Sequence, residues 1–554
     1  MPITAASDSP AASRDAPAEW NFADVWETVA LAQPGRVAQV HGEVEVTWRE
    51  FDERANGVAA WLLAAGCGRQ DKVALYLFNG PEYLQAAFAC LKVSLVPVNT
   101  NYRYRQEELR ALWDDADAAA VVFDASFAPT IADIRAQCTK VRAWLCVGDR
   151  AACPPWATPY EDATPLPACP STGQARTGDD LLLIYTGGTT GHPRGVMWRQ
   201  HDMYMASNTT GDAEAADPAR VRERVLDPAK PRPVGLPAAP LMHGTAFVFA
   251  ATILNRGGTV VTLPSRQLDI HEMLDAVQSR NVSELCIVGD AFCRPMVEAL
   301  DAQPGRWDLG SLKAVSSSGM MWGQANKDRL LRHAPHAVLV DFLNSSEASG
   351  MGRAVSSRDK PAKAARFKLG VNAVVLDADN RPLPAGSAEV GRIAVRGRVP
   401  LGYYGDPAKT AATFPVIDGV RHAIPGDFAR IEADGTVTLL GRGSVSINSG
   451  GEKVFPEEVE ECIKLMPAVR DALVVGVPHE RFGETVTAVV EVPADQRPAQ
   501  EAVIAHVRER LAGHKAPRHV LFVDSVGRGP NGKADYMGWR KRAAAALQAN
   551  TKDR

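Results

Sequence analysis

Short apolar segments alternate with longer helical patterns along most of this chain, and this alternation is the strongest constraint on its fold. The segments that predict buried strands are residues 72–77, 119–123, 181–185, 259–263, 284–288 and 338–343. Strands separated by helices of this length form βαβ units, whose strands pair in parallel. We therefore predict an α/β protein with largely parallel sheets.

The pattern changes after residue 370. Segments 371–376, 388–395 and 428–440 predict strands, and Gly, Pro and Asp-Gly turns separate them. Such turns join neighbouring strands as hairpins, so we predict a small antiparallel β unit over residues 370–440.

The C-terminal region has a third pattern. Helices near 456–465 and 500–512 and strands near 472–477 and 484–491 predict a compact α+β unit. Small and polar residues at 441–444 form a candidate hinge, although local sequence alone favours a simple surface loop. The predicted organisation is a disordered tail at 1–20, an N-terminal domain at 21–442 and a C-terminal domain at 443–554.

Composition excludes several classes of protein. The 554 residues are 46% hydrophobic and 23% charged, with a net charge of −4 that gives no electrostatic reason for nucleic-acid binding. The nine cysteines form no CxxC pair, which argues against a disulfide framework or a zinc site. No apolar run approaches the roughly 20 residues that span a bilayer. We expect a cytoplasmic enzyme; loose membrane attachment and a homodimeric state stay compatible with the sequence.

Residues 186–195 follow a predicted strand and combine glycine, threonine and arginine in one loop. Glycines let the backbone aim N–H groups at one point, while threonine hydroxyls and an arginine add donors and charge. The loop suits a polyphosphate but lacks the ending of a Walker A motif, and a flexible Gly/Thr turn is the alternative. The candidate phosphate-binding residues are Thr186, Gly187, Gly188, Thr189, Thr190, Gly191, Arg194 and Gly195.

This loop resembles the signature loop of the adenylate-forming superfamily, which comprises acyl-CoA synthetases, peptide-synthetase adenylation domains and luciferases. The resemblance implies that the loop binds the β- and γ-phosphates of ATP, with Thr189 among the catalytic residues. Arg194 stands where the family usually has lysine, which keeps the charge but changes its geometry to a fork. The resemblance also implies two mainly parallel α/β sheets and a small β-barrel unit, followed by a small mobile C-terminal domain.

Further motifs follow in the family's order. Residues 240–244 resemble the motif whose histidine, here His243, lines the acyl pocket. Residues 316–320 resemble the loop that borders adenine and the substrate carboxylate. This implies nucleotide contacts from Ser318 and Gly319, and substrate contacts from Gly319 and Met320. Taken alone, these would be a structural histidine and a Ser-rich turn.

Residues 344–347 resemble the end of the family's Tyr-Gly-x-Thr-Glu motif. The resemblance implies that Asn344, Ser345 and Ser346 contact the nucleotide, with the Ser346 hydroxyl on the α-phosphate, and that Glu347 ligates Mg²⁺, a cation that prefers carboxylate oxygen. Two positions depart from the family: Leu343 replaces the aromatic residue that stacks on adenine, and Asn344 replaces glycine.

The later motifs resemble the ribose-binding, hinge and CoA-binding segments of the family. Asp427 is implied to bind both ribose hydroxyls, and Arg442 to contact ribose and phosphate from the hinge, where Ser444 replaces the usual acid. Residues 449–456 resemble the loop that forms the CoA pantetheine tunnel, and 530–533 the motif of the catalytic lysine. The residues implied for CoA binding and catalysis there are Gly450, Gly451, Glu452, Lys453 and Lys533.

Together these motifs predict an ATP-dependent carboxylic acid:CoA ligase that forms an acyl-adenylate and uses ATP, Mg²⁺ and CoA. Segments 195–199, 287–292 and 441–445 most resemble bacterial fatty-acyl-CoA synthetases, including those for steroid side-chain acids. The alternatives are an adenylation enzyme that loads a carrier protein, a luciferase-like oxygenase and a nucleotide-binding regulator that has lost catalysis.

Overall fold

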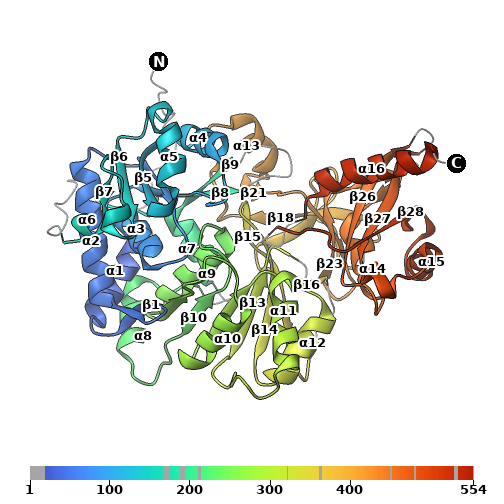
Figure 1. Cartoon of the computed structure of the whole chain (residues 1–554), viewed down its shortest axis with the longest axis horizontal. Coiled ribbons are helices and arrows are strands. Elements are labelled where there is room, and N and C mark those ends of the chain that lie inside the picture. The colour runs from blue at the N-terminus through green and yellow to red at the C-terminus, as the bar shows by residue number, and fades with distance from the viewer. Residues whose placement is uncertain are drawn as a thin grey trace.

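The computed structural model describes most of the chain. The described residues are 19–165, 175–186, 194–209, 214–320, 322–360, 365–449, 452–479, 482–529 and 534–552, without the side chains of 442, 444, 452, 453 and 548–552. Figure 1 shows a large N-terminal part and a smaller C-terminal unit beside it. Among the helices of these residues, none is both long and apolar enough to cross a membrane.

A long mixed sheet runs through the N-terminal part. Its strands β1, β11, β10, β12, β13 and β14 pair in parallel, and from β14 to β15 onward the pairing is antiparallel. The predicted β unit at 370–440 continues this sheet through hydrogen bonds from β16 to β23. The strands are β2 (Val44–Thr47), β1 (Val37–His41), β11 (Thr259–Thr262), β10 (Val234–Pro237), β12 (Glu284–Ile287), β13 (Ala314–Ser318), β14 (Val338–Ser345), β15 (Ala348–Ser356), β16 (Arg366–Leu369), β23 (Thr436–Arg442), β22 (Asp427–Ile431), β18 (Val390–Arg396), β17 (Ala373–Leu376), β21 (Val420–Ala423) and β20 (Val416–Ile417).

A second sheet lies in the first part of the chain. Parallel pairs join β8, β4, β3, β5, β6 and β7, and β9 and β19 extend the sheet in antiparallel pairing. The order is β19 (Gly402–Tyr403), β9 (Arg194–Arg199), β8 (Leu181–Thr186), β4 (Val96–Asn99), β3 (Lys72–Tyr76), β5 (Ala118–Asp124), β6 (Ala143–Val147) and β7 (Thr158–Pro159). Strand β19 comes from far along the chain, so this edge joins distant segments.

Helices cover both sheets, and their first turns explain where several begin. Asn21 and Thr47 each accept a hydrogen bond from the backbone N–H three residues on, and the acidic residue there bonds back, which makes two capping boxes. The helices are α1 (Phe22–Ala32), α2 (Trp48–Ala64), α3 (Pro81–Lys92), α4 (Gln106–Asp115), α5 (Ala128–Ile134), α6 (Tyr160–Ala163), α7 (Gln200–Asn208), α8 (Pro218–Leu226), α9 (Gly244–Leu254), α10 (Ile270–Ser279), α11 (Asp290–Ala302), α12 (Gln324–His333) and α13 (Pro407–Thr413).

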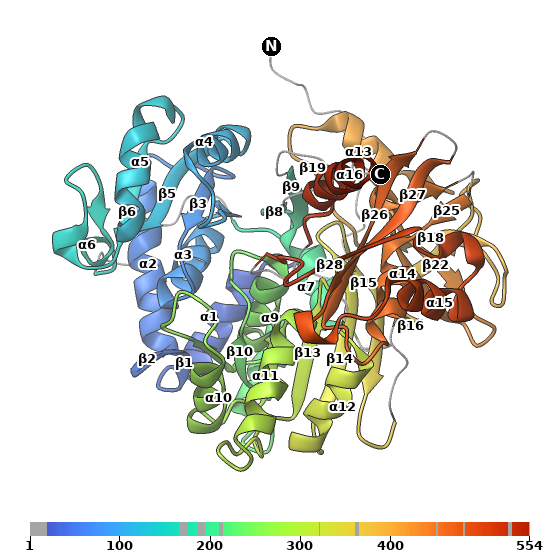
Figure 2. The ribbon, with the colours of Figure 1, turned by 45° about the vertical axis from the view of Figure 1, so that its right-hand side comes forward.

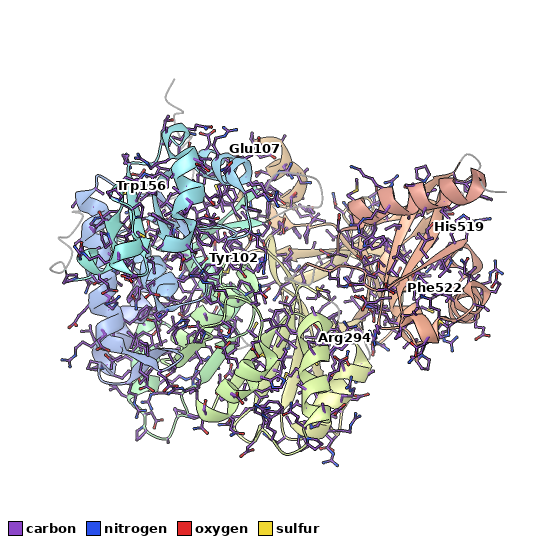
Figure 3. All side chains as sticks on the ribbon, in the orientation of Figure 1. Tyr102, Glu107, Trp156, Arg294, His519 and Phe522 are labelled. Atoms are coloured by element: carbon purple, nitrogen blue, oxygen red, sulfur yellow. The ribbon has the colours of Figure 1, made fainter. Side chains whose placement is uncertain are left out.

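The C-terminal unit has a sheet and cores of its own. Its sheet runs β25 (Glu452–Val454), β24 (Ile447–Ser449), β27 (Gly483–Glu491) and β26 (Asp471–His479), with β28 (His519–Val523) parallel to β27. Helices α14 (Pro456–Lys464), α15 (Gln500–Arg510) and α16 (Tyr536–Lys552) pack on it, as Figure 2 shows. Arg294 of α11, labelled in Figure 3, reaches this unit and donates a hydrogen bond to the Arg470 carbonyl at 2.9 Å.

The structure confirms the predicted α/β fold class. Each apolar segment that predicted a strand overlaps one. Strands β3, β5, β8, β11 and β12 are buried along most of their length, which is what an apolar run of four to eight residues allows in a parallel sheet. Strand β14 instead alternates, with Val338 and Phe342 each 37% exposed.

The first 18 residues of the predicted tail lie outside the described residues. Glu19 and Trp20 already contact the N-terminal part, Glu19 through an ion pair with Arg199 and Trp20 through ring contacts with His201 and Tyr204.

Candidate active site

The base of the predicted phosphate loop is the β8–β9 hairpin. Thr186 and Arg194 are directly opposite each other where the two strands end. Gly195 lies opposite Tyr185, and a Cβ atom at Gly195 would come within 2.6 Å of the tyrosine ring, so this position needs glycine. The loop residues predicted to hold phosphate, Gly187, Gly188, Thr189, Thr190 and Gly191, lie outside the described residues.

Arg194 is held by a carboxylate from another segment. Its Nε donates a hydrogen bond to Oδ2 of Asp406 at 3.2 Å. The second oxygen of Asp406 accepts the Lys409 backbone N–H at 2.9 Å and so caps α13. The helix start therefore fixes the carboxylate that orients Arg194.

Glu347 lies in the turn of the β14–β15 hairpin, and two strands of the other sheet hold this turn. The Tyr403 hydroxyl donates to Glu347 Oε1 at 2.8 Å, and Trp198 Nε1 donates to the Ser346 carbonyl at 2.8 Å. Ser345 Oγ accepts the Ala348 N–H at 3.1 Å within the hairpin. The turn is therefore fixed from both of its ends.

The Tyr403 hydroxyl stays a hydrogen-bond donor over the working pH range. Burial raises its pKa above the ordinary value, and the adjacent Glu347 carboxylate raises it further. One carboxylate oxygen of Glu347 is thus oriented by a neutral O–H donor, and carboxylate oxygens suit a divalent cation.

These contacts place the candidate site where the two sheets meet. Strand β19 pairs with β9, so Tyr403 and Asp406 reach Glu347 and Arg194 from one short segment. Figures 1 and 2 both show α13 beside β9. A cation and an anion held this way can bind phosphate oxygens and a divalent metal, respectively.

The two residues that depart from the family pattern behave differently. Leu343 is 7% exposed and packs in the large core, whereas Phe342, on the opposite face of β14, is 37% exposed. Because side chains alternate along a strand, this phenylalanine cannot replace the missing stacking ring. Asn344 fastens its own hairpin, since its Oδ1 accepts the Gly350 N–H at 2.7 Å.

The predicted substrate residues border the neighbouring strands. Ser318 ends β13 opposite Phe342, and Gly319 follows with a φ of +89°, a left-handed conformation that favours glycine. Half-buried Met320 packs against the large core. His243 occupies the N-cap position, directly before α9.

Asn99, at the end of β4, ties the phosphate-loop strand to the His243 segment. Its side chain donates to the Tyr185 carbonyl at 2.8 Å and to the Met242 carbonyl at 2.7 Å. The predicted phosphate and acyl regions are therefore neighbours.

The remaining predicted residues lie farther along the chain. Asp427 is buried at the start of β22, opposite Arg442 across the strand pair, and β16 and β23 separate β22 from β15. Glu452 and Lys453 lie on β25, without described side chains, whereas Gly450, Gly451 and Lys533 lie outside the described residues. Their roles stay predictions.

Sequence reasoning missed Asn99, Tyr403 and Asp406. A single asparagine, tyrosine or aspartate carries no signal by itself. The partner of Tyr403 lies 56 residues away in the sequence, and the partner of Asp406 lies 212 residues away. In the part of the chain that the structure describes, no group of three or more His, Cys, Asp or Glu side chains could hold a metal ion.

Comparison with known proteins identifies the family. Residues 26–404 match the model of the AMP-binding enzyme family, and residues 458–533 match the AMP-binding enzyme C-terminal domain. The chain therefore belongs to the AMP-binding enzymes, and the resemblance to the adenylate-forming superfamily is confirmed.

Curated relatives match nearly from end to end. The chain is 39% identical over 534 residues to a 3-oxocholest-4-en-26-oate–CoA ligase of Rhodococcus rhodochrous, which covers 94% of this chain and 95% of that protein. It is 38% identical over 538 residues to a medium/long-chain-fatty-acid–CoA/3-oxocholest-4-en-26-oate–CoA ligase of Mycobacterium tuberculosis, with 96% and 97% covered.

Solved structures share the fold. ATP-bound MatB from Rhodopseudomonas palustris has a TM-score of 0.78 at 25% identity, covering 95% of this chain and 99% of that one. The anthranilate CoA ligase AuaEII with anthranoyl-AMP has a TM-score of 0.80 at 20% identity, covering 97% and 99%.

Proposed function

We propose that this protein is an ATP-dependent acyl-CoA synthetase, which converts a carboxylic acid, ATP and CoA into acyl-CoA, AMP and diphosphate. The relatives that match nearly the whole chain are CoA ligases, which confirms the predicted reaction class. The structural observation that supports the proposal is the segment 402–406, in which Tyr403 contacts Glu347, the candidate metal ligand, and Asp406 contacts Arg194, the candidate phosphate-binding cation.

The phosphate end of the nucleotide site is the best supported part of the proposal. Thr186, the loop after it and Arg194 would bind the β- and γ-phosphates, with Ser346 on the α-phosphate. Glu347 fits Mg²⁺, because this ion usually takes one or two carboxylates together with substrate phosphates and needs no cluster of protein ligands. Bound there, Mg²⁺ would neutralise charge on the phosphates.

The reaction then proceeds in two displacements. A carboxylate oxygen of the acid attacks the α-phosphorus of ATP, and diphosphate leaves. Lys533, Thr189 and Arg194 would stabilise the charge that develops, so the catalysis is electrostatic. The CoA thiol then attacks the acyl carbon and AMP leaves, with the pantetheine arm passing the Gly450–Lys453 loop after the C-terminal unit has turned about Arg442.

We further propose that the acid is large and apolar, either a medium- to long-chain fatty acid or a steroid side-chain acid. The names of the matching relatives support this class. Helix α9, which begins directly after His243, supports it too, because its sequence GTAFVFAATIL carries no charged side chain. The cytoplasmic location and the homodimer stay predictions from the sequence.

Acid-dependent exchange of labelled diphosphate into ATP tests the proposal. Dodecanoate and 3-oxocholest-4-en-26-oate should support exchange and, with CoA, release AMP; acetate and benzoate should be at least about tenfold poorer, since each buried CH₂ contributes about 0.8 kcal/mol. A carrier protein in place of CoA is the control acceptor. Exchange without any acid, or thioester formation only on the carrier, would overturn the proposal.

A further inference from the structure

The segment 402–406, with the sequence Gly-Tyr-Tyr-Gly-Asp, belongs to no motif that sequence reasoning singled out. Its backbone pairs with β9, where the Tyr404 N–H donates to the Gly195 carbonyl at 2.8 Å. Tyr403 contacts Glu347 and Asp406 contacts Arg194. The segment therefore touches the base of the phosphate loop at several points.

The Arg194–Asp406 contact uses one particular edge of the guanidinium. Asp406 accepts a hydrogen bond from Nε, and the two Nη groups can donate two parallel hydrogen bonds to a phosphate. Asp406 itself cannot turn easily, because its other oxygen caps α13. An arginine in this place can bond to the carboxylate and to a phosphate at the same time.

A lysine at position 194 could not hold both the carboxylate and a phosphate in the same way. Its ammonium is a single point charge on a flexible stem, so a hydrogen bond to Asp406 would draw the charge toward the carboxylate and away from an incoming anion. The arginine that departs from the family's usual lysine therefore fits the aspartate that lies beside it.

We propose that Asp406 is a positioning residue for ATP: it holds Arg194 by Nε so that the Nη groups meet the β- and γ-phosphates. This inference rests on the proposed function, because it assumes that Arg194 binds the triphosphate. It adds a residue outside the motifs identified in the sequence and makes the effects of Asp406 and Arg194 depend on each other.

The contact serves placement more than stability. The side chains of Arg194 and Asp406 are 40% and 32% exposed, and ion pairs exposed to this degree contribute little to the free energy of unfolding. Asn at 406 would still cap α13, since Asn and Asp are equally good at helix starts. The substitution Asp406→Asn therefore removes the charge and keeps the fold.

The test is a double-mutant cycle on the apparent KM for ATP in the acid-dependent exchange assay. Asp406→Asn should raise KM about tenfold, the factor that corresponds to 1.4 kcal/mol, with kcat and the KM for the acid nearly unchanged. In an Arg194→Lys background the same substitution should leave KM unchanged or lower it by up to about twofold, because it frees the lysine ammonium from the carboxylate.

Asp217→Asn is the matched control. Asp217 also caps a helix that begins with proline, α8, and pairs with an arginine, Arg220, at 3.9 Å. This variant should leave the KM for ATP unchanged. Thermal unfolding of all variants checks that α13 and α8 stay folded.

Calorimetric titration with ATP alone separates this inference from the proposed function. If the wild type shows no acid-dependent exchange, the proposed function fails, while weaker ATP binding by Asp406→Asn would still support the positioning role. Unchanged KM and ATP affinity in Asp406→Asn, or equal effects of that change in both backgrounds, would overturn the inference.

Discussion

The two ends of the proposed nucleotide site lie on one hairpin, β14–β15, but are built by different means. At the phosphate end, hydrogen bonds from the second sheet fix Glu347 and the turn around it. At the adenine end, Leu343 is buried in the apolar core. The described hydrogen bond of the Asn344 side chain, from the Gly350 N–H, stays within the hairpin.

The difference follows from what each end has to bind. A charge that must meet a phosphate or a metal ion needs a defined direction, and directed hydrogen bonds supply it. A purine face needs only an apolar surface, and an aliphatic side chain supplies one without the gain from ring stacking. The chain therefore departs from the family pattern at the adenine end and keeps its glutamate at the phosphate end.

Loss of charge at Glu347 should have the largest effect. Glu347→Gln keeps the shape and the Tyr403 hydrogen bond but removes the negative charge that we propose binds Mg²⁺. We expect the adenylation rate to fall about 10²- to 10³-fold, as on loss of one strong electrostatic contact in a transition state. Thioester formation from a supplied acyl-adenylate should change only a few-fold, and rapid-quench measurement of each half-reaction checks this.

Glu432→Gln is the control for that change, because Glu432 also accepts a hydroxyl, from Thr438, in a hairpin of the same sheet. It should leave both half-reactions near the wild-type rates. Equal losses in the two half-reactions of Glu347→Gln would contradict the assignment of Glu347 to the phosphate end.

Tyr403→Phe should have an intermediate effect. Without the hydroxyl, Glu347 can rotate away from the orientation proposed for binding Mg²⁺, so kcat/KM for adenylation should fall about tenfold. In a Glu347→Gln background the added loss should be below about twofold. Because burial and Glu347 raise the pKa of Tyr403, the wild-type rate should show no loss from this group as pH rises to about 10.

The neighbouring variant Tyr404→Phe is the comparison for Tyr403→Phe. Its hydroxyl bonds to Asp117 and Lys72, away from Glu347, so it should lower the unfolding temperature and spare adenylation. Similar losses of kcat/KM in both tyrosine variants would mean that the β19 segment acts only by general stability.

Local patterns predicted the strands and the β8–β9 loop, because each depends on neighbouring residues along the chain. Ser346 and Glu347 were identified only through the resemblance to a family motif. The residues that fix these elements could not be predicted this way. Tyr403 and Asp406 act through pairing between β19 and β9, and that pairing depends on how distant segments fold together. The sequence marks Asn344 only as a departure from the family's glycine, and the structure gives its side chain a hydrogen bond inside the hairpin.

The smallest effect is expected from restoring the family's glycine at the adenine end. Asn344→Gly removes the bond to the Gly350 N–H and adds backbone freedom, so the free energy of unfolding should fall by about 1–2 kcal/mol. Because Asn344 bonds within the hairpin, the KM for ATP should change by less than about threefold.

Asn344→Asp should affect ATP binding and spare stability. It keeps the hydrogen-bond acceptor and the free energy of unfolding, but its negative charge beside the nucleotide should raise the KM for ATP. A large drop in KM for Asn344→Gly would show instead that ATP binding at the adenine end depends on backbone freedom at residue 344. The replacement of the family's glycine would then weaken ATP binding directly.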